Sequence, residues 1–457
     1  MDFPAHLFRE YDIRGRAGSE LSPAFAYELG QAFGSEALAR GEGLVVTGHD
    51  ARRSSPSLAL ALREGLMASG IDVYDAGLVT TPALYFATQG VSPALPTRAG
   101  VMVTGSHNPP PDNGFKLVLD GAALYGTAIG ALRQRMQARD YAAGRGRERR
   151  LDLLPEYLDR LVAGFAPLSQ PLRVVVDAGN GVAGLTAPAA LRRLGCEVIE
   201  LYCEPDGRFP NHHPDPLVPA NLEALCARVR ETGAALGLAF DGDADRLGVV
   251  TAGGGIVWPD RVMMALAAGV LCAQPGATIV FDVKCSSRLG ALIERLGGHA
   301  ECWKTGHSLI KARRAELAAP FAGEYSGHLC FADWYGLDDA LYAALRLVTL
   351  LVADGRDSDA LFADHPVGVS TPELRIACAD PHALAAQLQT LDWEGARRVT
   401  IDGVRAEWPD GWALVRASNT ESCLVLRLEA DDADTLAAIR ARVAARLAAV
   451  DPALALP

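Results

Sequence analysis

Three carboxylates at alternating positions give the strongest chemical signal in the sequence. Asp241, Asp243 and Asp245 follow the apolar run 236–240 and come directly before Arg246. Negative charges in so short a loop repel one another unless a cation lies among them, and an all-oxygen ligand set favours a hard cation such as Mg²⁺ or Ca²⁺. The loop is not an EF-hand, because Arg246 stands where that motif needs glycine. We expect a metal site; the alternative is a solvated acidic turn.

A serine lies in the segment TGSHNPP, residues 104–110, directly after the apolar run 101–103. A loop that is preceded by glycine and stiffened by proline can hold Ser106 exposed as a nucleophile. Lys116 follows ten residues later, and a lysine can stabilise phosphate charge or move a proton. By itself, such a segment is more often a polar turn.

Two further loops carry groups suited to a phosphorylated sugar. The segment RASNT, residues 416–420, has the guanidinium, hydroxyl and amide groups of a phosphate clamp. The segment GEYSGH, residues 323–328, places a carboxylate and a hydroxyl between glycines, which suits recognition of sugar hydroxyls, and His307 could add a cation or a proton donor. Without context, a hairpin turn and structural histidines are the simpler interpretations.

A fifth segment points to a different class of protein. Residues 179–184 read GNGVAG, a G-x-G-x-x-G pattern after a strand, and Glu200 lies at nearly the spacing of a dinucleotide-binding fold. An NAD(P)-dependent oxidoreductase is therefore the alternative function. It would leave the three aspartates unexplained, and the glycines could serve only close packing of a strand against a helix.

The elements that must position these loops follow a regular pattern. Short apolar runs end abruptly in polar loops, and stretches of helical periodicity lie between them. Such runs predict buried, mostly parallel sheets, in which ligands gather at the carboxyl ends of the strands. The runs are 44–46, 101–103, 173–176, 236–240 and 278–281, and the helical stretches include 57–67, 187–194, 221–230 and 287–296.

The pattern changes towards the C-terminus. Segments 399–406, 412–416 and 423–428 alternate like antiparallel strands, and 434–450 is periodic like a helix. We therefore expect three α/β domains followed by an α+β domain. The boundaries that we predict are 1–150 with the serine loop (104–110), 151–255 with the metal loop (241–246), 256–366 with the sugar loop (323–328) and 367–457 with the phosphate clamp (416–420).

Length and charge exclude several classes of protein. A chain of 457 residues is too long for one core, and a net charge of −12 argues against nucleic-acid binding. The apolar run 262–273 is shorter than a membrane helix, which needs about 20 residues. The nine cysteines include no C-x-x-C pair, which indicates free thiols in a reducing cytoplasm. No secretory signal is visible, so we expect a cytoplasmic protein without membrane or nucleic-acid partners.

Together, the four loops resemble the signature loops of the α-D-phosphohexomutase family, in the same order and over nearly the whole chain. Within that family, the bacterial phosphomannomutase/phosphoglucomutase branch is the most similar. The resemblance implies four domains around one central cleft. It also implies an isomerase that interconverts hexose 1-phosphate and hexose 6-phosphate of glucose or mannose, as a monomer or weak dimer. The cofactors implied are Mg²⁺ and glucose 1,6-bisphosphate, which is both activator and intermediate.

The resemblance also assigns roles to residues. Ser106 matches the phosphoserine, and it holds Mg²⁺ together with Asp241, Asp243 and Asp245. The candidate catalytic residues beside Ser106 are Lys116, Arg14, His328 and Arg246. The candidate substrate-binding residues are Tyr11, Lys284, His307, Glu324, Ser326, Arg416, Ser418, Asn419 and Thr420.

Two departures from the family pattern bear on the substrate. Ser422 stands where the family usually has proline, and Tyr325 stands where the branch commonly has methionine or glutamine. Neither removes a group that the mechanism needs; without proline at 422 we expect a less stiff clamp loop, and Tyr325 bears on which sugar is preferred. A phosphoglucosamine mutase is therefore an alternative within the family, and a non-catalytic phosphosugar-binding protein is a third hypothesis.

Overall fold

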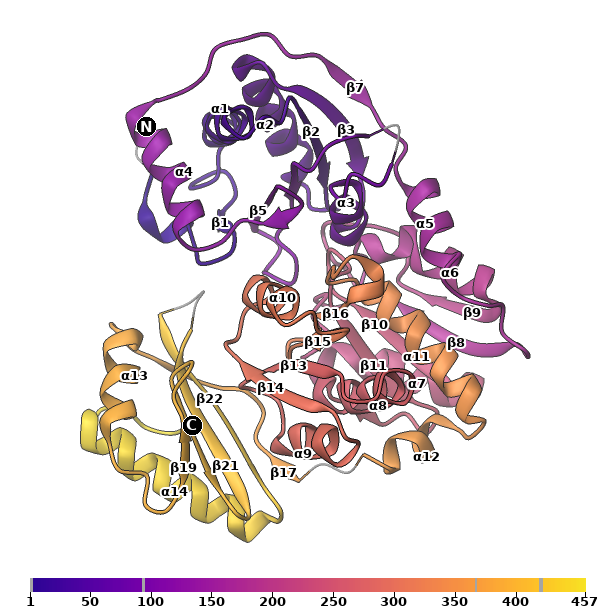
Figure 1. Cartoon of the computed structure of the whole chain (residues 1–457), viewed down its shortest axis with the longest axis vertical. Coiled ribbons are helices and arrows are strands. Elements are labelled where there is room, and N and C mark those ends of the chain that lie inside the picture. The colour runs from indigo at the N-terminus through magenta and orange to yellow at the C-terminus, as the bar shows by residue number, and fades with distance from the viewer. Residues whose placement is uncertain (1–2, 93–94, 366–367, 419–421) are drawn as a thin grey trace. The chain divides into compact units, whose positions relative to one another are not determined.

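The strand-and-loop pattern of the sequence becomes four β-sheets in the part of the chain that the structure describes (Figure 1). The computed structural model describes residues 3–92, 95–365, 368–418 and 422–457. These residues form two compact units. Unit 1 comprises Met1–Val262 and Ser326–Ala363, and unit 2 comprises Met263–Tyr325 and Asp364–Pro457.

The first sheet of unit 1 is mixed and has the strand order β1-β5-β4-β2-β3-β7. Strands β4, β2, β3 and β7 run parallel, whereas β5 is antiparallel to both β4 and β1, and the short β6 pairs with β5. The strands are β1 (Ile13–Arg16), β2 (Leu44–His49), β3 (Asp72–Leu78), β4 (Gly100–Val103), β5 (Asp112–Leu119), β6 (Ala122–Ala123) and β7 (Glu148–Arg150).

Helices α1 (Pro23–Ala39) and α2 (Ser55–Ser69) lie side by side next to this sheet (Figure 1). Two glycines let them approach closely: a Cβ on Gly30 would lie 2.2 Å from the Leu62 carbonyl oxygen, and one on Gly65 would lie 2.0 Å from that of Tyr27. Their apolar faces fill the core beneath the sheet. The helices α3 (Thr81–Ala87) and α4 (Thr127–Ala138) and the 3-10 helix η1 (Ala5–Leu7) complete this part.

The second sheet of unit 1 has the order β12-β11-β10-β8-β9. Strands β9, β8 and β10 are parallel, and β11 and β12 continue the sheet as antiparallel strands. The strands are β8 (Leu172–Asp177), β9 (Cys196–Leu201), β10 (Leu236–Phe240), β11 (Leu247–Thr251) and β12 (Ile256–Val257). The associated helices are α5 (Leu154–Val162), η2 (Val182–Leu185), α6 (Ala187–Leu194), η3 (Pro219–Leu222) and α7 (Glu223–Thr232). The last segment of unit 1 adds β16 (Leu329–Phe331), η4 (Ala332–Trp334), α11 (Ala340–Asp354) and α12 (Ser358–Ala363).

An aromatic cluster joins α3, which lies with the first sheet of unit 1, to α5 and α11, which lie with the second. The Trp334 ring stacks on Phe86 of α3, with centroids 5.8 Å apart, and on Tyr342 of α11, with centroids 5.2 Å apart. The buried Asp339, the N-cap of α11, accepts hydrogen bonds from the Tyr157 hydroxyl at 2.8 Å and from Trp334 Nε1 at 2.7 Å. These contacts fix α3, whose N-terminus reaches the metal loop, against α5 and α11.

Unit 2 contains a parallel sheet and an antiparallel one. In the parallel sheet, β13 (Thr278–Asp282) lies between β14 (His299–Trp303) and β15 (Phe321–Gly323), with α9 (Ser287–Arg295) and α10 (His307–Glu316). Helix α8 (Pro259–Ala273) contains the boundary between the units. The C-terminal sheet has the order β17-β22-β21-β20-β19, with β18 also paired to β22. Its elements are β17 (Val369–Ser370), β18 (Leu374–Ala377), α13 (Pro381–Thr390), β19 (Arg397–Val399), β20 (Val404–Trp408), β21 (Gly411–Ala417), β22 (Cys423–Ala430) and α14 (Ala433–Val450).

The C-terminal sheet shows why strand alternation was visible in the sequence. Alternate residues of β20, β21 and β22 pack against α13 and α14 in one core. The two helices cover one face of the sheet (Figure 1). Trp412 and Leu414, on the other face, pack with Val283.

The expected fold class is confirmed: α/β domains with mixed, mostly parallel sheets are followed by an antiparallel α+β domain. All five apolar runs are strands. The single strand expected at 399–406 is wrong, because the chain turns through Gly403, whose φ is +68°, between β19 and β20. All nine cysteines are free. Among the described helices, none combines the length and apolar character that crossing a membrane requires.

Candidate active site

The serine loop follows β4 and lies against the metal loop. Ser106 is 1% exposed and adopts a φ of +49°, and its Oγ donates a hydrogen bond to Asp241 Oδ2 at 2.7 Å. Its backbone N–H donates to Thr104 Oγ1 at 2.8 Å. A positive φ is unusual for serine and is maintained only where surrounding contacts fix it. The loop therefore holds the hydroxyl against the carboxylate predicted to bind metal.

The three aspartates converge after β10, as the sequence predicted. Asp241, Asp243 and Asp245 are completely buried, and one ligand atom from each lies within 4.8 Å of the others. Among the described residues, Asp243 Oδ1 is buried without a hydrogen-bond partner. A buried unpartnered carboxylate oxygen is costly, and coordination of a hard cation would satisfy it. The donor set therefore fits a divalent metal ion.

Lys116 of β5 supplies positive charge to this cluster. Its Nζ donates to Asp243 Oδ2 at 2.7 Å and to Asp245 Oδ2 at 2.5 Å. Burial alone would lower the pKa of Lys116, but Asp243 and Asp245 raise it well above its usual value. Burial also favours protonation of Asp245, yet the charges of Lys116 and His328 hold its pKa well below the ordinary range.

Asp241 behaves differently from its two neighbours. Burial, followed by the negative charges of Asp245 and Asp243, raises its pKa well above the usual value. Asp241 Oδ1 accepts hydrogen bonds from the backbone N–H groups of Asp245 at 3.0 Å and Arg246 at 3.1 Å. The loop backbone thus orients the carboxylate that meets Ser106.

Asp243 is also anchored by the N-terminus of α3. Thr81 donates its hydroxyl to Asp243 Oδ2 at 2.6 Å, and its N–H donates to the Asp243 carbonyl oxygen at 3.0 Å. The metal loop is therefore held by elements of both sheets of unit 1.

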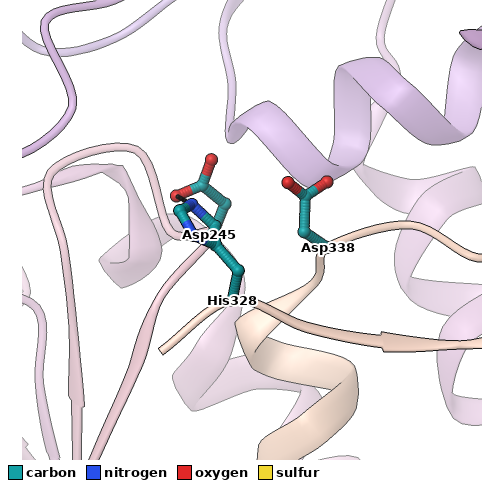
Figure 2. A group of neighbouring side chains, drawn as sticks. All are labelled: Asp245, His328 and Asp338. Atoms are coloured by element: carbon teal, nitrogen blue, oxygen red, sulfur yellow. Dashed lines mark ion pairs between the residues drawn. The ribbon is translucent and has the colours of Figure 1, made fainter. Parts of the chain in front are cut away.

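His328 approaches the cluster from the segment before β16. Its Nε2 lies 3.2 Å from Asp245 Oδ1, and its Nδ1 lies 2.9 Å from Ser326 Oγ. Figure 2 shows the His328 ring against the Asp245 carboxylate, with the Asp338 carboxylate to one side. The predicted residues Ser326 and His328 thus meet the aspartate loop within unit 1.

Arg14 and Arg246 also lie beside the serine loop. The Arg14 guanidinium donates to Asp12 at 2.6 Å, to the Gly105 carbonyl oxygen at 2.7 Å and to Asn108 Oδ1 at 2.9 Å. The charges of Arg246 and Arg14 add to burial in lowering the pKa of His107 well below its usual value, so this imidazole is neutral at neutral pH. Tyr11 is half-buried just before β1.

Unit 2 holds the other predicted binding residues. Glu324 is buried, and its Oε1 accepts a hydrogen bond from the Gly306 N–H at 2.6 Å, directly before His307 at the start of α10. Burial would lower the pKa of Lys284, but Glu373, Asp282 and Glu324 raise it.

The phosphate-clamp segment lies at the end of β21. Arg416 is 4% exposed, and its Nε donates to Asp402 Oδ2 at 2.9 Å. The Ser418 N–H donates to the Cys423 carbonyl oxygen at 2.9 Å. Arg416 and Glu324 both act electrostatically on Lys284, Arg416 lowering its pKa and Glu324 raising it. Asn419 and Thr420 lie outside the described residues.

Comparisons with known proteins agree with this geometry. The chain matches all four domain models of phosphoglucomutase/phosphomannomutase: alpha/beta/alpha domain I over residues 5–142, domain II over 155–254, domain III over 258–367 and the C-terminal domain over 373–446.

Individual relatives match over nearly the full length. A phosphomannomutase/phosphoglucomutase of Pseudomonas aeruginosa is 49% identical, over 99% of this chain and 98% of its own. A phosphoglucomutase of Neisseria gonorrhoeae is 45% identical, over 93% of each chain. The crystal structure of a phosphoglucomutase/phosphomannomutase family protein from Burkholderia thailandensis superposes with a TM-score of 0.95 and 45% identity, covering 100% of both chains.

The chain belongs to the phosphoglucomutase/phosphomannomutase family. The resemblance seen in the four loops is thereby confirmed.

Close backbone contacts give the G-x-G-x-x-G segment a structural role. It follows β8, but its last glycine lies in the 3-10 helix η2, and a Cβ there would lie 1.8 Å from the Cys203 carbonyl oxygen. A Cβ on Gly181 would lie 3.0 Å from the Gly242 Cα in the metal loop. The glycines let the chain pack closely against the backbone at Cys203 and at Gly242 of the metal loop, whereas the packing expected from the sequence was that of a strand against a helix.

Sequence reasoning missed several residues that shape the site. Asp50 and Arg52 follow β2 and bind the serine loop, and Thr81 binds Asp243. The sequence signal for Asp50 is the polar loop after the apolar run 44–46, one of the strand ends at which ligands are expected. Their partners are more than 50 residues away in sequence, so only the tertiary fold identifies them.

Proposed function

We propose that this protein is a phosphohexomutase that interconverts hexose 1-phosphate and hexose 6-phosphate. The observation that carries the proposal is the buried Ser106 hydroxyl, which donates to Asp241 at 2.7 Å beside two further aspartates. A nucleophile placed against a metal-binding carboxylate loop suits phosphoryl transfer, which depends on positioning and charge neutralisation. Full-length relatives with mutase names support the same assignment.

Ser106 is the group that we propose carries the phosphoryl group between the two ends of the sugar. Its neighbours Lys116 and Arg14 are firmly cationic and would neutralise charge on the transferring group. Asp241, Asp243, Asp245 and phosphorylated Ser106 would hold Mg²⁺, which when bound supplies charge stabilisation for the leaving oxygen.

His328 is the candidate that best suits proton transfer. Imidazole readily takes and gives a proton near neutral pH, whereas Lys116 donates to two carboxylates and Arg14 to the serine loop. The ring lies between Ser326 Oγ and Asp245. We propose that His328 moves the proton of the attacking sugar hydroxyl, with Arg246 binding phosphate beside it.

Residues of unit 2 would recognise the sugar and its second phosphate. Glu324, with Ser326 of unit 1, would bind sugar hydroxyls. The non-reacting phosphate would meet Arg416, Ser418, Asn419 and Thr420, with Tyr11, Lys284 and His307 as further contacts. If these hydroxyl contacts form with the sugar ring in either orientation, the bisphosphate intermediate can reorient between the two half-reactions.

The finer features of the proposal follow the same reasoning. We propose glucose 1,6-bisphosphate as activator and intermediate, and a monomer or weak dimer that acts on small phosphosugars. We also propose four domains, at 1–150, 151–255, 256–366 and 367–457. Nine free cysteines suit the cytoplasm as the location.

A coupled assay tests the function. Purified protein with Mg²⁺ and a trace of glucose 1,6-bisphosphate should convert glucose 1-phosphate or mannose 1-phosphate to the 6-phosphate, and chelation of Mg²⁺ should stop turnover. Ser106→Ala should abolish turnover, whereas Ser57→Ala, at an exposed position of α2, should not. Intact mass should show about 80 Da on the wild type that phosphatase removes and that Ser106→Ala never gains.

The same assay separates the alternatives. Comparing kcat/KM for glucose, mannose and glucosamine phosphates identifies the preferred sugar. An absence of Mg²⁺-dependent turnover with all three phosphosugars would refute the proposal. If, in addition, Ser106→Ala binds the phosphosugar as tightly as the wild type does, a non-catalytic binding protein would be favoured. Calorimetric titration with NAD(P) should show no binding.

A further inference from the structure

The Arg52 guanidinium is buried beneath the serine loop and bonded to its backbone. The side chain is fully buried. Its Nη1 donates to the carbonyl oxygens of Pro109 at 2.7 Å and Asp112 at 2.9 Å. Its Nη2 donates to those of Ser106 at 2.7 Å and Asn108 at 2.6 Å. Four bonds match the four Nη hydrogens of arginine, so this end of the guanidinium is fully used within one loop.

The loop supplies few backbone donors of its own: the Asn108 N–H donates to the Gly105 carbonyl oxygen at 2.9 Å and the Asp112 N–H to that of Pro109 at 3.0 Å. Pro109, Pro110 and Pro111 are consecutive, and proline has no backbone N–H. Carbonyl groups buried with no donor nearby cost free energy. One planar guanidinium satisfies carbonyls spread from residue 106 to 112, which the single ammonium of a lysine cannot reach with the same geometry.

Asp50 holds the other end of the loop and also orients Arg52. Its Oδ2 accepts hydrogen bonds from Thr104 Oγ1 at 2.8 Å and the Gly105 N–H at 3.1 Å, and it lies 3.2 Å from Arg52 Nε. A Cβ on Gly105 would lie 2.3 Å from Arg52 Nε. Glycine at this position lets the loop lie directly on the guanidinium.

A turn from the second sheet of unit 1 covers Arg52 from another side. The Phe209 ring centroid lies 5.3 Å from Arg52 Cζ, and a Cβ on Gly207 would lie 2.7 Å from Arg52 Cα. Arg52 is therefore enclosed between the serine loop and this turn, and it has little freedom to move away from Ser106.

We infer that Arg52 is a positioning residue that fixes the serine loop in its reactive conformation. By holding the Ser106 carbonyl and the carbonyls that follow it, Arg52 maintains the positive φ that places Ser106 Oγ against Asp241. The guanidinium acts through the loop backbone and does not contact the hydroxyl. The catalytic consequence rests on the proposed function, because a displaced nucleophile slows phosphoryl transfer.

Arg52→Met and Arg52→Lys test this role, with Arg53→Met as a matched control at the adjacent exposed position. Arg52→Met should lower kcat for glucose 1-phosphate by about 10²-fold, the usual effect of a misplacement of about 1 Å. The KM should change by less than about threefold, because the proposed sugar contacts do not include this loop. Arg52→Lys should keep the charge but recover little kcat, and Arg53→Met should match the wild type.

Hydrogen exchange supplies a readout that does not depend on turnover. Arg52→Met should exchange faster in peptides covering residues 104–113 and show wild-type exchange in α1, α2 and the second sheet. Guanidinium ion at millimolar concentration should restore kcat to Arg52→Ala, whereas urea, which is neutral and similar in shape, should not. If Arg52→Met does not fold, Gly105→Ala displaces the loop while keeping the buried charge, and it should show the same local exchange and kcat loss.

The outcomes separate the two proposals. The positioning role is overturned if hydrogen exchange of residues 104–113 in Arg52→Met equals that of the wild type, or if exchange is faster throughout unit 1. An unchanged kcat of Arg52→Met overturns it as well. If the wild type shows no mutase turnover, the proposed function fails. Localised exchange in the Arg52 variants would then still support Arg52 as the residue that holds the loop.

Discussion

At the scale of single residues, the site is a problem of charge balance. Three buried carboxylates lie within one loop, and Lys116 donates to two of them. Asp241, which has no such partner, is the one whose pKa is raised, by burial and by its neighbours. The contacts of Lys116 therefore distinguish Asp243 and Asp245, whose pKa values are lowered, from Asp241, whose pKa is raised and which accepts a hydrogen bond from Ser106.

Removing the ammonium should unbalance the site and strengthen its response to metal. In EDTA, we expect Lys116→Met to unfold with a free energy about 3–5 kcal/mol lower than the wild type, because buried carboxylates lose their partner. Added Mg²⁺ should raise the Tm of the variant by more than that of the wild type, because the cation meets uncompensated charge. Thermal unfolding with and without Mg²⁺ measures both effects. Equal Tm shifts in the two proteins would contradict this account.

Glu373 should give unit 2 a specific sensitivity to acid. Burial opposes ionisation of Glu373, but the charges of Lys284 and Arg375 lower its pKa to about 2, against an ordinary value of 4.5. A lowered folded-state pKa adds stability that is complete above the ordinary value and is lost as the pH falls towards 2. A quarter of the side chain is exposed, so solvent screening limits the effect to about 2 kcal/mol.

Glu373→Gln removes this contribution. We expect the variant to be less stable than the wild type at pH 7 and nearly equal to it at pH 2, as measured by denaturant unfolding across the pH range. The exposed Glu394→Gln is the control and should follow the wild type. A stability difference that did not shrink on acidification would show that Glu373 acts through packing rather than charge.

At the scale of elements, close backbone approach decides where the loops lie. The segment 179–184 has glycines because the chain passes within contact distance of the backbone at Cys203 and Gly242. The same pattern in a dinucleotide-binding protein would leave space for a pyrophosphate. A pattern of glycines indicates that some group lies close to the backbone, but it does not indicate whether that group is protein backbone or a ligand.

Gly184→Ala should therefore be costly. Its Cβ would lie 1.8 Å from the Cys203 carbonyl oxygen, and such overpacking costs about 1–3 kcal/mol. Gly130→Ala in α4 is the contrasting variant, because its Cβ would meet no atom within 4 Å, and it should stabilise the helix by about 0.5–1 kcal/mol. Thermal shifts of opposite sign are expected, and a neutral Gly184→Ala would refute the packing role.

At the scale of the whole molecule, two compact units each have their own core. The net charge of −12 does not prevent anion binding, because basic side chains gather locally. Arg14 and Arg246 lie beside the serine loop and Lys116 binds the aspartates in unit 1, while Lys284 interacts with both Glu324 and Arg416 in unit 2. Phosphate recognition therefore depends on the placement of cations rather than on their total number.

Two cores predict unfolding that is not two-state. Scanning calorimetry should give a calorimetric enthalpy larger than the van 't Hoff enthalpy. Lys116→Met should move the transition of unit 1 and Glu373→Gln that of unit 2. A single transition with equal enthalpies, displaced as a whole by both variants, would show that the units unfold as one.

The sequence alone determined the chemistry of the four loops and the alternation of strands and helices. Apolar runs ending in polar loops predicted β2, β4, β8, β10 and β13, and the order of the motifs identified the family. These features are local, because a strand needs only its own apolar residues and a loop only its own functional groups.

Tertiary structure decided which groups meet. Lys116 reaches Asp243 across 127 residues, and Arg52 reaches Ser106 across 54. The glycines of 179–184 serve packing because another segment fills the space beside them. No local pattern encodes these contacts. They depend on the order of distant strands within a sheet and on which loops of the two sheets of unit 1 contact each other.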